Sequence, residues 1–443
     1  MRNICCLIVI VFIGFVGAPS VHAHFMFVRL LPPAEAGRFA EVYFSDKADA
    51  GDPRFIDKIA STKLWMQAKP GVFDPLTVRP TADRLRAFIP SAGGLCVVGE
   101  CTYGVLARGK MPFLLRHYPK AVSGNAEEIA AFKPKQEIPF EIQMREVGGA
   151  LEFVALVNGK PSPGASFSAV PTDLKEHKFT ADVQGKATWK PTTPGYYAVY
   201  TGRKLKDAGT HDGEKYGEIR EFTTLAFAWP LQAKGPDPDA VKLFQDATAA
   251  RAAWHDFPGF RADISANADG RTWKGSVTID AKGTVALTEL DEVVTPWVRE
   301  QLDSLVLHRM ARPEGKPPIV RFADQNLTHA LGRLVIFEGG QFASSYRVKD
   351  RQVMVVNRLL GKVNMTITVL ENDVNADKKF LPRAYTVQYW NGKTGDLQRV
   401  ETVQNRWTRL GAWDVPTEVT VLSASSVGVG VKTMTLTRHQ LQK

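Results

Sequence analysis

The sequence has none of the short motifs that mark the common enzyme classes. It contains no HExxH zinc motif, no phosphate-binding loop and no GxSxG nucleophile turn. Gly428-Val429-Gly430 lacks the third glycine of a dinucleotide-binding turn and lies among strand-forming residues. Acidic pairs such as Asp291-Glu292 are typical of ordinary surface, because sequence alone does not place two carboxylates across a cleft. We therefore expect a protein that is not an enzyme.

Charge of one sign is not concentrated anywhere in the chain. The 443 residues include 56 Lys and Arg against 46 Asp and Glu, giving a formal net charge of +10 that is spread along the sequence. A diffuse excess of this kind favours loose attraction to anionic surfaces and argues against nucleic acid as a partner. With 44% hydrophobic and 23% charged residues the composition is that of a globular protein, and the length suggests two or three domains.

Only one apolar run approaches the length of a membrane span, and it lies at the start. Arg2 precedes a run from Ile4 to Ala18, Pro19 ends it, and Val21 and Ala23 supply the small residues of a signal-peptidase site. This pattern predicts a signal peptide over residues 1–23, cut after Ala23, and therefore export to the periplasm or the extracellular space. An uncleaved membrane anchor is the alternative.

Cysteine is scarce, with four in the chain and two of these in the predicted signal peptide. The remaining pair, Cys96 and Cys101, lies in LCVVGECTYG, where Gly99 suggests a tight hairpin. An oxidising compartment would allow the two thiols to pair, so we expect a disulfide between them. A metal site is the weaker alternative, because zinc usually takes four ligands and this stretch offers two.

Short alternating segments with Gly and Pro between them predict a mainly β protein. We expect a first β unit over residues 24–135 and an immunoglobulin- or prealbumin-like β-sandwich unit over 136–230, with a short helix between Asp52 and Thr62. The proline-rich stretch PLQAKGPDPDA predicts a linker over 231–238. The remainder, 239–443, is expected to form a separate α+β domain.

In this last region apolar and polar residues alternate, as they do along the strands of a large antiparallel sheet. Phe260, Ala262 and Ile264 predict a half-buried strand, and Asn391-Gly392 predicts a hairpin. One helix is expected from Asp239 to Trp254, and a second from Thr295 as N-cap, with apolar residues on one face of each. The domain should therefore be an extended, curved antiparallel sheet with one or two helices packed on it.

The first half, over about residues 24–230, resembles the exported DUF4198 family. The resemblance is carried by Ala23-His24-Phe25, by Tyr103-Gly104-Val105, by the stretch from Pro112 to Lys120 and by the second β unit from Val157 to Tyr197. That family is related to the periplasmic substrate-binding part of nickel and cobalt uptake systems. The resemblance therefore implies a β-sandwich that handles a transition metal.

The second half resembles the DUF3386 family. The matching stretches are Trp254 to Phe260, Trp297 to Arg309, Phe380 to Arg383 and Trp407 to Pro416. The resemblance implies a strand-rich layout similar to the half-barrels of periplasmic lipoprotein carriers, which is an analogy of fold and not of function. Several Trp residues in this half could line an apolar groove if the sheet curls.

His24 is the sharpest candidate ligand. Cleavage after Ala23 would leave it at the N-terminus, where its amine and imidazole together suit Cu(II) or Ni(II). His117 is the candidate second ligand, with a packed aromatic in a strand as the alternative. His211 and Asp212 form a third candidate, with a solvated turn as the alternative.

Taken together, the sequence predicts an exported, non-enzymatic binding protein that handles nickel, cobalt or copper through its first half. The alternative is a periplasmic carrier of a hydrophobic or lipid ligand through its second half, and a copper oxygenase is a weaker third reading. The expected partners are a metal ion or a small apolar ligand, with an envelope or membrane-surface partner left open, and the oligomeric state is not defined by the sequence.

We expect His24 to be the first residue of the exported protein. N-terminal sequencing of material isolated from the compartment outside the inner membrane checks this directly. A sequence that starts at Met1 would instead support an uncleaved anchor.

Overall fold

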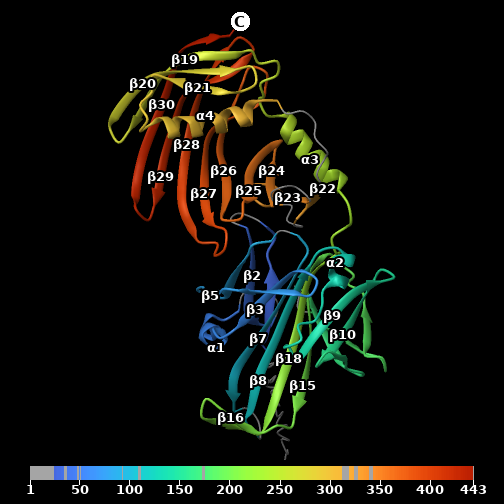
Figure 1. Ribbon diagram of the computed structural model, residues 1–443. Coiled ribbons are helices and arrows are strands. Elements are labelled where there is room, and N and C mark those ends of the chain that lie inside the picture. The colour runs from blue at the N-terminus through green and yellow to red at the C-terminus, as the bar shows by residue number, and fades with distance from the viewer. Residues whose placement is uncertain are drawn as a thin grey trace, which may run out of the picture.

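The protein is described here by a computed structural model that covers residues 24–33, 37–46, 49, 51–91, 93–107, 111–171, 175–311, 319–323, 328–338 and 343–442. The predicted signal peptide lies outside these residues. As the sequence predicts, the chain is mainly β, with large antiparallel sheets and few helices. Figure 1 shows an N-terminal half, coloured blue to green, below a C-terminal half coloured yellow to red. Within the described part of the chain no helix is long and apolar enough to cross a membrane.

The N-terminal half consists of three β layers and a small hairpin. The outer layer on one side contains β1 (Phe25–Leu30), β2 (Arg38–Ser45), β6 (Leu85–Ile89) and β5 (Val78–Pro80), in that order. The central layer is an eight-stranded sheet with the order β13 (His177–Thr180), β12 (Ser166–Pro171), β15 (Gly195–Leu205), β18 (Glu218–Trp229), β8 (Phe113–Ser123), β7 (Leu95–Leu106), β3 (Lys63–Lys69) and β4 (Val72–Leu76). The outer layer on the other side contains β9 (Phe140–Val147), β10 (Ala150–Val157), β11 (Lys160–Pro161) and β14 (Lys186–Trp189), and the hairpin is β16 (Gly209–His211) with β17 (Glu214–Tyr216).

The central sheet runs across the boundary predicted at residue 135. Strands β8 and β18 pair in parallel, from Glu218 opposite Phe113 to Ala226 opposite Ala121. Strands β3, β4, β7 and β8 therefore share one sheet with β12, β13, β15 and β18. The two predicted β units do not have separate sheets, because a long-range pairing that no local pattern indicates joins them.

Each face of the central sheet is covered by a different layer, and this gives the half two cores. One core contains Phe27 and Val42 of the first layer together with Val97 and Ala226 of the central sheet. The other contains Phe153 of β10 and residues of the central sheet that alternate with those of the first core. Strand residues point alternately to opposite faces, so a sheet buried on both sides reads as a nearly continuous apolar run.

The predicted disulfide between Cys96 and Cys101 is not formed, and both thiols are free and buried. The prediction is wrong because Gly99 is not in a hairpin; it lies inside the twelve-residue strand β7, opposite Leu64. Cys96 packs in one core and Cys101 in the other, on opposite faces of the sheet. An extended strand of this kind separates residues five apart by roughly 16 Å, far beyond the distance that a disulfide spans.

Helices are short in the N-terminal half. The predicted helix between Asp52 and Thr62 is a 3-10 turn, η1 (Pro53–Phe55), followed by α1 (Ile56–Ile59). Asp52 caps this turn by accepting a hydrogen bond from the backbone N–H of Arg54. Helix α2 (Ala126–Ala131) was not anticipated, although Asn125 and Glu128 form the capping box that would have indicated it.

The C-terminal half is one twelve-stranded antiparallel sheet. Its order is β21 (Val285–Thr288), β20 (Arg271–Asp280), β19 (Gly259–Ala268), β30 (Gly428–Leu441), β29 (Trp413–Ser425), β28 (Leu397–Leu410), β27 (Phe380–Asn391), β26 (Val363–Val374), β25 (Gln352–Leu359), β24 (Ala343–Lys349), β23 (Arg333–Glu338) and β22 (Ile319–Phe322). Figure 1 shows that the sheet curls and that its helices lie on the inner side of the curl. The curved sheet predicted from the alternation is confirmed.

The helices of this half are α3 (Pro238–Ala249) and α4 (Thr295–Arg309). Both lie where the sequence indicates, but α3 ends at Ala249 and does not reach the predicted end at Trp254. The N-cap of α3 is Asp237 rather than Asp239, because its carboxylate accepts from the backbone N–H groups of Asp239 and Ala240. Thr295 is the first helical residue of α4 rather than its cap.

The segment predicted as a linker contacts both halves. The backbone N–H of Gln232 donates to Gly124 O at 3.3 Å, and Lys234 pairs with Glu127 at 2.8 Å. On the other side, Arg321 donates to Ala233 O at 2.5 Å. Proline prevents the segment from joining a sheet, as expected, but these hydrogen bonds hold it in place between the two halves.

We expect Cys96 and Cys101 to resist a thiol reagent in the folded protein and both to react once it is unfolded. Their exposed fractions are 1% and 3%, and burial raises the pKa of Cys96 to about 12 and that of Cys101 above its usual range. Little reactive thiolate is therefore present at pH 8. Thiol titration of the chain that starts at His24, in guanidinium without reductant, should give two groups per molecule, whereas a disulfide would give none.

Candidate functional site

The predicted ligand His24 lies at the start of β1, packed between aromatic rings. Its ring centroid is 5.7 Å from that of Phe44 and 5.5 Å from that of Phe55. Its Nδ1 atom lies 3.4 Å from Oδ1 of Asp46. This Asp46 oxygen is buried and has no hydrogen-bond partner within the described part of the chain. The imidazole therefore faces a carboxylate oxygen that is not otherwise satisfied.

The second predicted ligand, His117, is a core residue on β8. It packs beside Phe44 and Phe222, with ring centroids 5.6 Å and 6.0 Å away. Neither ring nitrogen has a hydrogen-bond partner among the described residues. Burial lowers the pKa of His117 to about 3, so the imidazole is neutral at pH 7. His24 and His117 share Phe44 as a neighbour.

His211 and Asp212 lie in the hairpin between β16 and β17. Asp212 has a φ of 49°, and its carboxylate is 3.4 Å from Nε2 of His211. Asp and Gly tolerate this left-handed conformation, so turn geometry accounts for the pair. Among the residues that the structure describes, no three His, Cys, Asp or Glu side chains lie close enough together to hold a metal ion.

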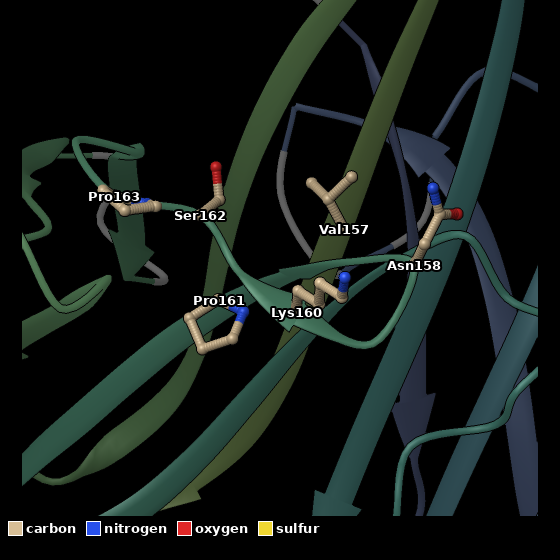
Figure 2. A pocket seen from close by; sticks show the side chains of 6 residues that line it. All are labelled: Val157, Asn158, Lys160, Pro161, Ser162 and Pro163. Atoms are coloured by element: carbon tan, nitrogen blue, oxygen red, sulfur yellow. The ribbon is translucent and has the colours of Figure 1, made fainter.

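A shallow hollow lies beside the turn between β10 and β11. It is lined by Val157, Asn158, Lys160, Pro161, Ser162 and Pro163. Figure 2 shows these side chains spread along one loop and pointing in different directions. Asn158 has a φ of 49°, as expected of a turn residue. Nothing in the hollow converges on a common point, so we do not consider it a candidate site.

The strongest candidate is the inner face of the C-terminal sheet, which we define as the face on which α3 and α4 lie. One row of directly opposed residues crosses this face from β28 to β22: Glu401, Val387, Ile367, Val356, Tyr346, Val335 and Phe322. A second row lies beside it: Arg399, Tyr389, Met365, Arg358, Ser344, Phe337 and Val320. The strand register therefore makes much of this face apolar from end to end.

The two helices cover opposite ends of the inner face. Helix α4 buries Val298, Leu302 and Val306 in a core with residues of β19, β20, β28, β29 and β30. Helix α3 packs on β22 to β25, where the Phe244 ring lies 4.6 Å from that of Phe337. These are two separate clusters, so each helix closes its own end of the sheet.

Between the two cores lies an apolar strip, which we call the central strip and define as Val356, Met365, Ile367 and Val369. Each of these side chains is partly exposed, and none belongs to either core. They are nevertheless neighbours of core residues, because Val369 is opposite Tyr385 and Val356 is opposite Tyr346. The strip is thus apolar surface that continues two cores but is not covered by either helix.

The opposite, outer face of the same strands is polar and docks on the N-terminal half. Thr366 donates to the Asn357 amide oxygen at 2.8 Å, and the Asn357 amide group donates to Ser345 at 3.0 Å. Ser345 in turn donates to the backbone oxygen of Pro33. All three side chains are buried, so the N-terminal half covers this part of the outer face. An ion pair between Arg79 and Asp396 also joins the halves.

Cationic groups gather at one side of the central strip, where the ends of α3 and α4 meet. Arg251 donates to the backbone oxygen of His308 at 2.9 Å, and Arg309 donates to Ala252 O at 2.9 Å. Burial, together with the positive charges of Arg251, Arg358 and Arg309, lowers the pKa of His308 to about 4. His308 is therefore neutral at pH 7 although its side chain is partly exposed.

Among the residues that the structure covers, Arg358 is not paired as Arg399 and Glu401 are, and it does not stack on an aromatic ring as Arg333 does on Phe322. Arg399 and Glu401 form an ion pair with atoms 3.3 Å apart, and Tyr389 donates to Glu401 at 3.0 Å. Within the described part of the chain, Arg358 forms no ion pair or hydrogen bond, and its Nε atom is buried without a partner. Its direct neighbour across the strands is Met365, so the guanidinium borders the central strip.

Residues 236–441 match a family described as a protein of unknown function, DUF3386. The predicted resemblance of the C-terminal half is thus confirmed, whereas no family match supports the resemblance of the N-terminal half to DUF4198. No curated protein matches the chain. A solved structure of a LolA superfamily protein from Nitrosomonas europaea is 11% identical, covering 46% of this chain and 94% of that one with a TM-score of 0.16. A score this low carries no inference.

Sequence reasoning missed the central strip and Arg358. Individual strands of this region do alternate and each pairs with the next along the chain, but the register that lines up their side chains in one row cannot be read from the alternation. Arg358 had one local signal, a charged residue that follows Asn357 inside a run from Val353 to Leu360 whose other residues are apolar. Such a residue in a strand is either at an edge or has a role on one face.

Proposed function

We propose that the protein is an exported, non-enzymatic carrier of a hydrophobic ligand, an acyl chain, held on the inner face of the C-terminal sheet. The central strip is the observation that carries this proposal. Apolar surface that stays exposed to water between two packed cores is unfavourable, because covering it would lower the free energy by about 25 cal/mol per Å². Exposed apolar surface of this kind typically marks a binding site.

An acyl chain suits the chemistry of the strip. Val356, Ile367 and Val369 offer branched aliphatic surface, and Met365 adds a flexible thioether that adapts to different shapes. These four side chains contain no strong hydrogen-bond donor to orient a polar ligand. Met365, Ile367 and Val369 follow one another on one face of β26 over about 13 Å, so one acyl chain can lie along that strand beside Val356 of β25.

The division of the two faces supports a carrier rather than a second structural core. The N-terminal half is docked on the polar outer face through Ser345 and Pro33, which leaves the inner face unobstructed by it. Helices α3 and α4 cover only the ends of that face. The N-terminal half then acts as a docking module.

The proposal predicts that a negative charge introduced into the central strip weakens the binding of an apolar ligand. Ile367→Asp places a carboxylate in the central strip, and we expect the affinity for an uncharged apolar fluorophore to fall by about tenfold or more, because the carboxylate loses water when the ligand covers it. Fluorescence titration measures the affinity, and circular dichroism and thermal melting check the fold. Ile367 is already partly exposed, so the fold should tolerate the substitution.

Thr368→Asp is the matched control. Thr368 follows Ile367 on β26 and points to the other face, opposite Val355 of β25. The Thr368→Asp variant carries the same added charge, and we expect its affinity for the fluorophore to stay within about twofold of that of the unaltered protein. Equal loss in the two variants, or no binding by the unaltered protein, would contradict a site on the inner face.

A transition-metal site at His24 is a second candidate, favoured by the unsatisfied oxygen of Asp46. Removal of residues 1–23 would give His24 a free amine, so amine, imidazole and the Asp46 carboxylate would offer two nitrogens and one oxygen. Copper and nickel both accept such ligands. His117 lies in the core and has a pKa of about 3, so it does not suit the role of the second histidine of a copper oxygenase.

Titration of the chain that starts at His24 with Cu(II) and Ni(II) tests this candidate. We expect submicromolar binding that His24→Ala abolishes and Asp46→Asn weakens about tenfold, since an amide is a poorer ligand than a carboxylate. His211→Ala, in an exposed turn, should bind as the unaltered protein does. Binding weaker than micromolar, or equal binding by His24→Ala, would remove the metal from consideration.

A further inference from the structure

The carrier site contains an uncompensated positive charge. Arg358 lies on the inner face, directly opposite Met365 on β26 and Ser344 on β24. Its Nε is buried and has no partner within the described residues. Leaving a guanidinium group partly desolvated without a counterion is unfavourable, and buried charges in proteins are normally paired. A position of this kind is expected where a ligand supplies the missing anion.

Nearby groups strengthen the positive potential. Arg251, Arg309 and Arg358 all act on His308, so the three guanidinium groups surround that imidazole within electrostatic range. Arg251 and Arg309 are held by the backbone oxygens of His308 and Ala252, which fixes the ends of α3 and α4 at this point. Glu401, in the first row, has its carboxylate paired with Arg399 and accepts a hydrogen bond from Tyr389.

We propose that the ligand is an anionic amphiphile, a long-chain carboxylate whose acyl chain lies on the central strip and whose head group pairs with Arg358. This rests on the proposed carrier function and adds the charge of the ligand to it. The planar guanidinium fork matches a carboxylate in a bidentate arrangement, which an ammonium group does not. The row order places the two parts of such a molecule correctly, because Arg358 and Met365 are adjacent and Ile367 follows on the same face.

The test compares dodecanoate with dodecanol, which have the same chain and differ in the head group. Each is titrated at pH 7.5 against the full exported chain loaded with an uncharged apolar fluorophore, below the concentration at which the amphiphile aggregates. For the unaltered protein we expect dodecanoate to bind about tenfold more tightly than dodecanol, the gain of one charge-assisted pair.

Substitution at Arg358 separates a head-group role from a structural one. Arg358→Gln should lower the affinity for dodecanoate about tenfold and leave the affinity for dodecanol unchanged. Arg358→Lys should have an intermediate affinity for dodecanoate, since it keeps the charge but loses the planar guanidinium fork. Arg406→Gln is the control, because Arg406 lies on the outer face of β28, exposed and 3.7 Å from Glu418. The Arg406→Gln variant makes the same change in net charge, and it should bind both ligands with the affinity of the unaltered protein.

The outcomes distinguish the two proposals. If the unaltered protein binds dodecanoate and dodecanol equally, or if Arg358→Gln weakens both alike, the head-group assignment is wrong while an apolar carrier site stands. If neither amphiphile displaces the fluorophore and the fluorophore itself does not bind, the carrier function fails as well. A preference for dodecanoate that survives in Arg358→Gln would place the anion elsewhere.

Discussion

The strict alternation of side chains along a strand is the constraint on which the C-terminal half depends. Because the period is two, each strand must present one face to the helices and the other to solvent or to the N-terminal half. In a twelve-stranded sheet this produces an apolar face wider than α3 and α4 can cover. The partly exposed strip at Ile367 and the polar, docked face at Asn357 are two results of the same geometry.

The N-terminal half solves the same problem differently. Its central sheet has apolar residues on both faces, and a second layer covers each, so Phe27 and Phe153 belong to cores on opposite sides. At the predicted metal residues, His117 is enclosed by Phe44 and Phe222. The central sheet of the N-terminal half is thus packed on both faces by a further β layer, whereas the inner face of the C-terminal sheet is packed by two helices. This difference is why we place the proposed ligand in the C-terminal half.

Local patterns in the sequence predicted local structure well. Alternation at Phe260, Ala262 and Ile264 corresponds to β19, and the apolar face of the helix at Val298 and Leu302 packs as expected. Predictions failed where they needed partners distant in the chain. Gly99 suggested a turn because glycine usually does, yet in β7 it allows close approach of Leu64, whose side chain would lie 2.5 Å from an added Cβ atom. Arg358 and Met365 lie close in the chain, but only the register of the hairpin that joins β25 and β26 places them on the same face.

The pairing of distant strands also orders the events of folding. Strand β8 pairs with β18 about a hundred residues later, and β19 pairs with β30 at the end of the chain. Loop closure over such distances is slow, because its entropy is lost before the contacts form. During synthesis the central sheet can form only after residue 229 is available, and the C-terminal sheet only when the last strand has left the ribosome. Until then β19 lacks its neighbour β30, whereas the strands from β22 to β29 can already pair, each with the next along the chain. The unpaired edge of β19 is exposed to aggregation in the meantime.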